Sequence, residues 1–207
     1  MNLLERRRAL MNVYRSLLPK EYQRVEYLES KGTQYINTGL KNIMGKFEVD
    51  FARNDTTSSV YILGTRQNGT VNSLASTTNY NLLWQFGGAA YADIAWNLDT
   101  NRHKVIAEAS ANELALSFDG TTKSAASSIT SNTLNVYLFG RNNDGVLQAI
   151  GGMKLYCFRY WNEYGKLTRD FVPCYRKSDN KSGLYDLVNG EFYTNQGTGE
   201  FLIGGEI

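Results

Sequence analysis

The sequence contains only two cysteines, one histidine and two prolines among 207 residues, and its charges nearly cancel. Two cysteines cannot build a disulfide framework, and with a single histidine they cannot complete a Cys/His zinc site. We expect Cys157 and Cys174 to be small buried hydrophobic side chains. The alternative is one disulfide bond, which would need an oxidising compartment. A net charge of +2 does not favour nucleic acid as a partner.

Long apolar runs are also missing. No stretch approaches the roughly 18 consecutive apolar residues of a membrane-spanning helix, so we expect no membrane span. Residues 1–18 lack the apolar run and small-residue cleavage site of a secretory signal, and we expect synthesis in a cytoplasm without secretion. Phosphate-binding glycine loops and His-Glu-x-x-His are absent too, which removes the commonest nucleotide and zinc enzymes.

Glycine and tyrosine are abundant, with 19 and 14 copies, as in proteins of short strands and tight turns. Apolar and charged residues alternate over residues 46–51, and a similar alternation over 113–118 runs into Asp-Gly at 119–120, a hairpin signal. Asn-Gly at 189–190 predicts a further hairpin with a type I′ turn. The pattern predicts an all-β, two-sheet antiparallel sandwich, formed as one domain by residues 19–207.

The first 18 residues follow a different pattern. Apolar residues recur every seven positions among basic ones, which predicts a short amphipathic helix that ends before Pro19. Such a helix is marginal alone, so its stripe must lie on its own domain, on copies of itself or on a partner. We expect the helix to be an arm that attaches the domain to a partner or to copies of itself. Packing on its own domain stays open as the alternative. The arm residues are Leu3, Arg6, Arg7, Arg8, Leu10, Met11 and Leu17.

Both ends of the chain carry long, specific motifs. Residues 18–39 read Leu-Pro-Lys-Glu-Tyr-Gln-Arg-Val-Glu-Tyr-Leu-Glu-Ser and, after one lysine, Gly-Thr-Gln-Tyr-Ile-Asn-Thr-Gly. Near the other end, Arg-Asp-Phe-Val-Pro at 169–173 precedes Gly-Leu-Tyr-Asp-Leu-Val-Asn-Gly-Glu-Phe-Tyr-Thr-Asn at 183–195. The chain resembles, through these motifs, the LamG-like, concanavalin A-like jelly-roll proteins of phages and prophages.

This resemblance implies a jelly-roll sandwich of a virion, often in tail appendages, that is presumed to bind glycans or other surfaces. We therefore expect a non-enzymatic tail, fibre or capsid-decoration protein. Its partners would be other virion proteins or copies of itself through the arm, and a cell-surface glycan. One alternative is a glycan-active hydrolase or lyase of the same fold. Another is a purely structural virion subunit without a ligand.

Catalytic residues are not evident. Glycosidases of this fold use paired carboxylates from a Glu-x-Asp-x-x-Glu strand. Glu48 and Asp50 match its first two positions, but Arg53 occupies the third, so we expect an ordinary solvated strand face. His103, the only histidine, lies between two basic residues without a nucleophile motif nearby, and we expect it to be solvated at a strand edge.

Two stretches could bind a ligand. Aromatic residues flank a glycine pair at 87–88, where a surface groove could form, and the Arg-Asn-Asn-Asp-Gly run at 141–145 offers oxygen atoms in a loop. Its one carboxylate falls short of the charge that calcium sites usually gather, so we expect a plain turn, with a calcium site as the alternative. We otherwise expect no cofactor. Trp84 should be core, whereas Trp161 could face either way. The candidate ligand-binding residues are Tyr80, Tyr91, Trp96, Arg141, Asn142, Asn143 and Asp144.

The arm leads to the first prediction. A chain that starts at Lys20 keeps every strand signal and nearly all of both end motifs, so its melting temperature should be nearly unchanged. It should lose self-association or particle attachment. Light scattering and thermal melting of the two chains, side by side, test this. If the shorter chain unfolds, the arm belongs to the core and its attachment role is wrong.

Overall fold

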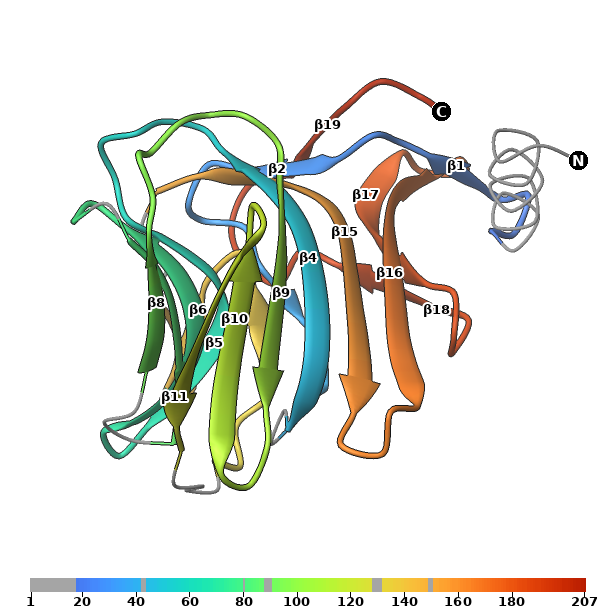
Figure 1. The fold of residues 1–207 in the computed structure, drawn as a ribbon. Coiled ribbons are helices and arrows are strands. Elements are labelled where there is room, and N and C mark those ends of the chain that lie inside the picture. Colours follow the sequence, from blue (N-terminus) through green and yellow to red (C-terminus); the bar gives the residue numbers. More distant parts are fainter. Residues whose placement is uncertain (1–17, 42–43, 80, 88–90, 128–131, 149–150) are drawn as a thin grey trace, which may run out of the picture.

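The computed structural model describes residues 18–41, 44–79, 81–87, 91–127, 132–148 and 151–207. They form two β-sheets packed face to face (Figure 1), which confirms the predicted all-β sandwich. No helix occurs among the described residues, and this part of the chain therefore contains no helix able to cross a membrane. The predicted N-terminal helix lies outside the described residues, except for its last position, Leu18.

The larger sheet has 11 strands, paired antiparallel throughout. β1 (Tyr22–Arg24) extends it beside β16, and β2 (Leu28–Ser30) pairs with β15 and with β19 (Leu202–Ile203). The main order is β11 (Thr121–Ala126), β10 (Glu113–Phe118), β9 (His103–Ala109), β4 (Gly45–Arg53), β15 (Met153–Asn162), β16 (Leu167–Arg176), β17 (Lys181–Asp186) and β18 (Glu191–Thr194).

The smaller sheet has eight strands and one parallel pairing, so the predicted antiparallel pattern fails at one place. Phe139 has a left-handed φ of 66°, and the chain changes direction there. The strand before it therefore runs antiparallel to β5 and the strand after it parallel. The strands are β14 (Val146–Gln148), β13 (Arg141–Asn143), β5 (Val60–Gln67), β6 (Thr70–Thr77), β7 (Asn81–Phe86), β8 (Tyr91–Ala95), β12 (Tyr137–Leu138) and β3 (Ile36–Asn37).

An aromatic row fills the core between the sheets. Trp84 of the smaller sheet is fully buried, as predicted, and its ring meets Phe47 of β4 edge-on at a centroid distance of 4.8 Å. Phe158 and Phe171 extend the row along the larger sheet, with centroids 5.8 Å apart. Each fully buried ring of this kind contributes about 1.5–3 kcal/mol. The Trp84 indole N–H donates to the carbonyl oxygen of Glu108 at 2.9 Å, so its polar edge is satisfied.

The two predicted hairpins differ in outcome. Asp119 and Gly120 form a two-residue loop with φ of 46° and 79°, the geometry of a type I′ turn. Between β17 and β18, however, the connection has four residues and only Gly190 has positive φ, so the predicted type I′ turn is wrong. The buried carboxylate of Asp186 explains the difference, because it accepts a hydrogen bond at 2.7 Å from the amide of Asn189 and organises a wider turn.

The cysteines are unpaired. Cys174 is buried in a small cluster on the outer side of β16 and β17, which Leu18 covers, and Cys157 is half-buried. Burial raises the pKa of Cys157 to about 11 and that of Cys174 to about 12. Both thiols are therefore protonated near neutral pH. Cys174 is the small buried side chain expected from the sequence, whereas Cys157 lies half-buried opposite Asp50 on β4.

His103 is not the solvated edge residue expected from the sequence. It lies on β9, between β4 and β10, and its side chain is only 11% exposed. Its Nε2 atom is 2.8 Å from Asp99 and its Nδ1 atom is 3.0 Å from Asp119, while its ring packs against Trp96. The correction has a simple cause: strand alternation turns His103 inward with its pairing partner Phe51.

A pH-dependent prediction rests on Asp99. Burial tends to raise its pKa, but hydrogen bonds from His103 and the N–H of Asn101 hold the pKa below the usual 3.8. Since the folded-state pKa is depressed, the stabilisation is present above pH about 3.8 and is lost as pH falls through the folded-state value. Asp99→Asn should therefore lower the melting temperature at neutral pH, with a difference that shrinks in acid. Asp93→Asn, at an exposed carboxylate bonded to a neutral amide, is the control.

Gly45 gives a third prediction. Its φ is +122°, and a Cβ atom there would collide with the carbonyl oxygen of Trp161 on β15. Gly45→Ala should lower the free energy of unfolding by about 2–3 kcal/mol, through backbone strain and overpacking. Chemical denaturation measures this. Gly205→Ala, where a Cβ meets open space, should change it little, and equal stability of all three proteins would contradict the close approach.

Candidate ligand-binding site

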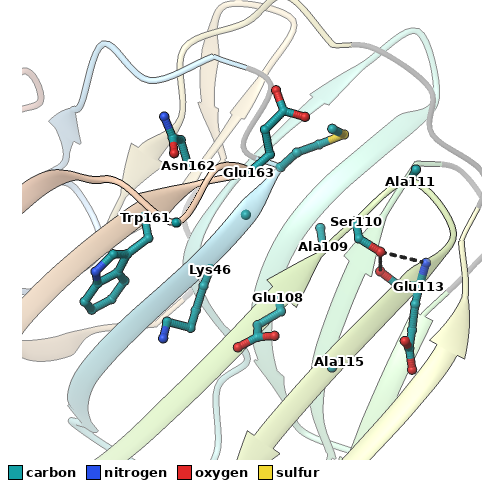
Figure 2. A pocket seen from close by; sticks show the side chains of 13 residues that line it. Lys46, Glu108, Ala109, Ser110, Ala111, Glu113, Ala115, Trp161, Asn162 and Glu163 are labelled. Atoms are coloured by element: carbon teal, nitrogen blue, oxygen red, sulfur yellow. Dashed lines mark hydrogen bonds between the residues drawn. The ribbon is translucent and has the colours of Figure 1, made fainter.

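A hollow of about 630 Å³ lies on the outer face of the larger sheet. It forms where β4 begins, β9 passes into β10 and β15 turns toward β16 (Figure 2). Its volume falls within the range of about 300–1,000 Å³ that is common for small-molecule pockets. The described residues that line it include none of the candidate ligand-binding residues predicted from the sequence.

Strand pairing explains why the surface sinks here. Lys46 of β4 lies opposite Glu108 of β9 on one side and Trp161 of β15 on the other. Glu108 in turn lies opposite Ala115 of β10. Three neighbouring positions of this row thus carry long side chains, whereas the next position carries only the methyl group of Ala115. A hollow therefore opens above Ala115.

Trp161 forms one wall. It is half-buried, on the outer face, next to the inward-facing Tyr160. The Lys46 Nζ atom lies 4.6 Å from the centroid of the Trp161 ring, a cation–π contact (Figure 2). The sequence left the orientation of Trp161 open, and the structure turns it outward.

The turn beyond Trp161 is firmly held. The Asn162 Oδ1 atom accepts hydrogen bonds from the backbone N–H groups of Tyr164 at 3.1 Å and Lys166 at 3.0 Å. At the start of the neighbouring strand β4, the hydroxyl of Tyr160 donates to the carbonyl oxygen of Met44 at 2.6 Å, and burial raises the pKa of Tyr160 to about 12. Tyr164, at the tip of the turn, is 84% exposed. These bonds hold the turn after β15 and the start of β4 in place before any ligand arrives.

The carboxylates on this face fall into two groups. Glu48 is paired with Lys104 at 2.8 Å and with Arg159 at 3.1 Å. Asp50 is paired with Arg102 at 2.6 Å. The outer face of this strand, which the sequence predicts to be solvated, therefore carries carboxylates whose charges are neutralised by ion pairs. Around the hollow, the exposed side chains of Glu108, Glu113 and Glu163 have no ion-pair partner among the residues that the structure describes.

Arg53, which breaks the glycosidase pattern, does not reach this face. It is buried at the end of β4 and points between the sheets. Its guanidinium donates to the hydroxyl of Ser76, to the carbonyl oxygen of Ser58 and, at 3.0 Å, to that of Asp55. It is a structural side chain that ties the loop after β4 to the smaller sheet.

The aromatic candidates from the sequence separate. Tyr91 is 54% exposed on the edge strand β8, beside a smaller hollow of about 300 Å³. Trp96 is buried in the core, edge-on to Phe51 at 6.0 Å, so it offers no stacking surface to a ligand. Its burial corrects the sequence-based expectation, because Trp96 is in phase with the inward-facing Ile94 of β8. Tyr80 lies outside the described residues.

The second predicted stretch forms the β13–β14 hairpin at the other edge of the smaller sheet. Arg141 is buried with its guanidinium 4.3 Å from the Tyr61 ring centroid, and the amide of Asn142 donates to a backbone carbonyl at 2.9 Å. Asn143 and Asp144 lie at the turn, where Asp144 has a φ of 48°. The two predicted stretches are therefore on opposite edges and form no common site. No cluster of metal-binding side chains occurs within the described ranges.

No protein-family model and no curated protein matches the sequence. Among solved structures, laminin domains LG4–5 of the mouse alpha1 chain have a TM-score of 0.56 at 15% identity. The match covers 87% of this chain and 46% of the laminin fragment, so the chain spans about half of that protein.

Two further likenesses are weaker. A CBM40 module of Ruminococcus gnavus IT-sialidase has a TM-score of 0.42 at 17% identity, covering 68% of this chain and 91% of that one. The Bacillus subtilis module CBM66 has a TM-score of 0.40 at 12% identity, covering 65% and 91%. At such identities a likeness speaks to the fold alone, and the laminin match together with the two packed sheets shows a LamG-like jelly-roll sandwich.

Proposed function

We propose that the chain is a non-enzymatic glycan-binding module whose ligand occupies the hollow between β4, β9, β10 and β15. The observation that carries this proposal is Trp161, held at the wall of a preformed hollow among polar side chains. Sugars combine an apolar ring face with a rim of hydroxyl groups. They suit a site that pairs one aromatic side chain with several hydrogen-bonding groups.

Preorganisation supports binding here. Lys46 fixes the Trp161 ring through the cation–π contact, and the Asn162 turn fixes the backbone beside it. A ligand then loses less free energy to the ordering of side chains than it would on a mobile surface. Tyr164, exposed next to the hollow, could extend the contact along an oligosaccharide.

Hydrolysis or elimination is the second candidate, because three glutamates share the hollow. A glycosidase needs two carboxylates that flank the scissile bond, one of them kept protonated by its surroundings. Glu108, Glu113 and Glu163 are all exposed, so burial supplies no such environment. This favours binding without catalysis.

The proposed setting is a phage or prophage virion. Its support is the resemblance carried by residues 18–39 and 183–195. The basic segment of residues 1–18 would then attach the module to other virion proteins or to copies of itself. A purely structural subunit without a ligand is the alternative. Mass spectrometry of purified particles tests the setting: absence of the chain from them would contradict it.

A glycan array followed by calorimetric titration of the glycans that bind tests the site. Trp161→Ala should weaken binding about tenfold, or about 1.4 kcal/mol, because the stacking surface is lost. Tyr91→Ala is the control, since it removes another exposed aromatic ring that does not line the hollow. It should leave affinity unchanged.

The other outcomes are equally informative. Loss of binding in Tyr91→Ala but not in Trp161→Ala would move the site to the edge of β8. An array without any bound glycan would favour the structural subunit. Shortened or unsaturated products after incubation with bound oligosaccharides would favour the enzyme.

A further inference from the structure

The charges that line the hollow do not balance. One lysine, Lys46, stands among three glutamates, Glu108, Glu113 and Glu163. All three carboxylates are exposed and have no ion-pair partner within the part of the chain that the structure describes. Among the residues that line the hollow, carboxylates therefore outnumber ammonium groups three to one.

The rest of the face shows that this imbalance is local. Toward the middle of the same strands, Glu48 contacts two cations, and Arg159 also contacts the buried Asp170 at 3.1 Å. Strand pairing thus neutralises the centre of the sheet. Uncompensated charge remains where the strands end and the hollow lies (Figure 2).

A metal ion does not fit this charge. A calcium ion needs several oxygen ligands within about 2.6 Å, and no three acidic side chains among the described residues converge in that way. The glutamates come from β9, β10 and the turn after β15, at separate points of the rim. Separate carboxylates suit a larger ligand with several spaced positive charges.

The aromatic wall agrees with a cationic ligand. The Trp161 ring already receives the ammonium group of Lys46 at 4.6 Å. This contact shows that the ring attracts an ammonium group, here the protein's own. A ligand ammonium group could bind a glutamate while its sugar ring lies on the remaining aromatic surface.

We propose that the hollow selects glycans with free ammonium groups, such as oligosaccharides of de-N-acetylated glucosamine, over their N-acetylated and acidic counterparts. This inference rests on the proposed glycan-binding function and names its ligand class. A polymer of glucosamine carries one ammonium group on each sugar. It can therefore meet several carboxylates around one hollow.

Calorimetric titration of the full chain with three probes tests the inference: a β-1,4-linked glucosamine hexamer, the N-acetylglucosamine hexamer and a galacturonate hexamer. The glucosamine hexamer should bind at least about tenfold more tightly than the N-acetylated one. Its affinity should fall with added sodium chloride, since salt screens exposed charges. The galacturonate hexamer should not bind measurably.

Variants locate the effect. Glu108→Gln and Glu113→Gln should each weaken binding of the glucosamine hexamer about two- to fivefold, as expected for exposed charge pairs. The triple variant that includes Glu163→Gln should lose the preference over the N-acetylated hexamer. Glu21→Gln, at an exposed carboxylate on the N-terminal segment, is the matched control and should bind normally. Thermal melting confirms that each variant is folded.

Two failures are distinguishable. Equal or tighter binding of the N-acetylated hexamer, still weakened by Trp161→Ala, would overturn the ammonium preference and leave the proposed function intact. No binding of any probe or array glycan would overturn the proposed function itself. Unchanged affinity in the triple variant would show that the glutamates do not select the ligand.

Discussion

The aromatic row between the sheets is the constraint on which the rest of the structure depends. Phe47 of β4 and Phe158 of β15 both face Trp84 or its neighbours in the core. Because side chains alternate along a strand, these inward rings set the opposite orientation for the residues next to them. Lys46 and Trp161 face outward for this reason, and the two meet because their strands are paired in register.

The same register arranges the charges. Glu48, Arg159 and Asp170 lie directly opposite one another on three adjacent strands. Burial raises the pKa of Asp170 in spite of the neighbouring Arg159. The surroundings of these three charged side chains are therefore partly desolvated, and an unpaired charge there would be costly. Pairing is therefore needed at the centre of the sheet. At the strand ends solvent screens single charges, and Glu108 can remain unpaired at little cost.

Much of the fold could be predicted from local patterns, and most of the site could not. Alternation over residues 46–51 and the Asp-Gly pair at 119–120 act over short distances, and both features form as expected. The turn near Asn189 was mispredicted because Asp186, a buried long-range anchor, reorganises it. The hollow joins residues from the start of β4 and from the ends of two hairpins, β9–β10 and β15–β16. Its key feature is a small residue, Ala115, which carries no signal in the sequence.

Trp161 shows most directly why the face of the sheet on which a side chain lies could not be predicted from the sequence. Counting by twos from the inward-facing Leu155 places Trp161 on the inner face. The pairing of β15 with β4 shifts register between Leu155 and Cys157, so that Tyr156 is an extra residue. A one-residue shift moves every later side chain to the opposite face. Phe158 then faces the core, and Trp161 reaches the outer surface, so the wall of the proposed site exists because of this irregularity.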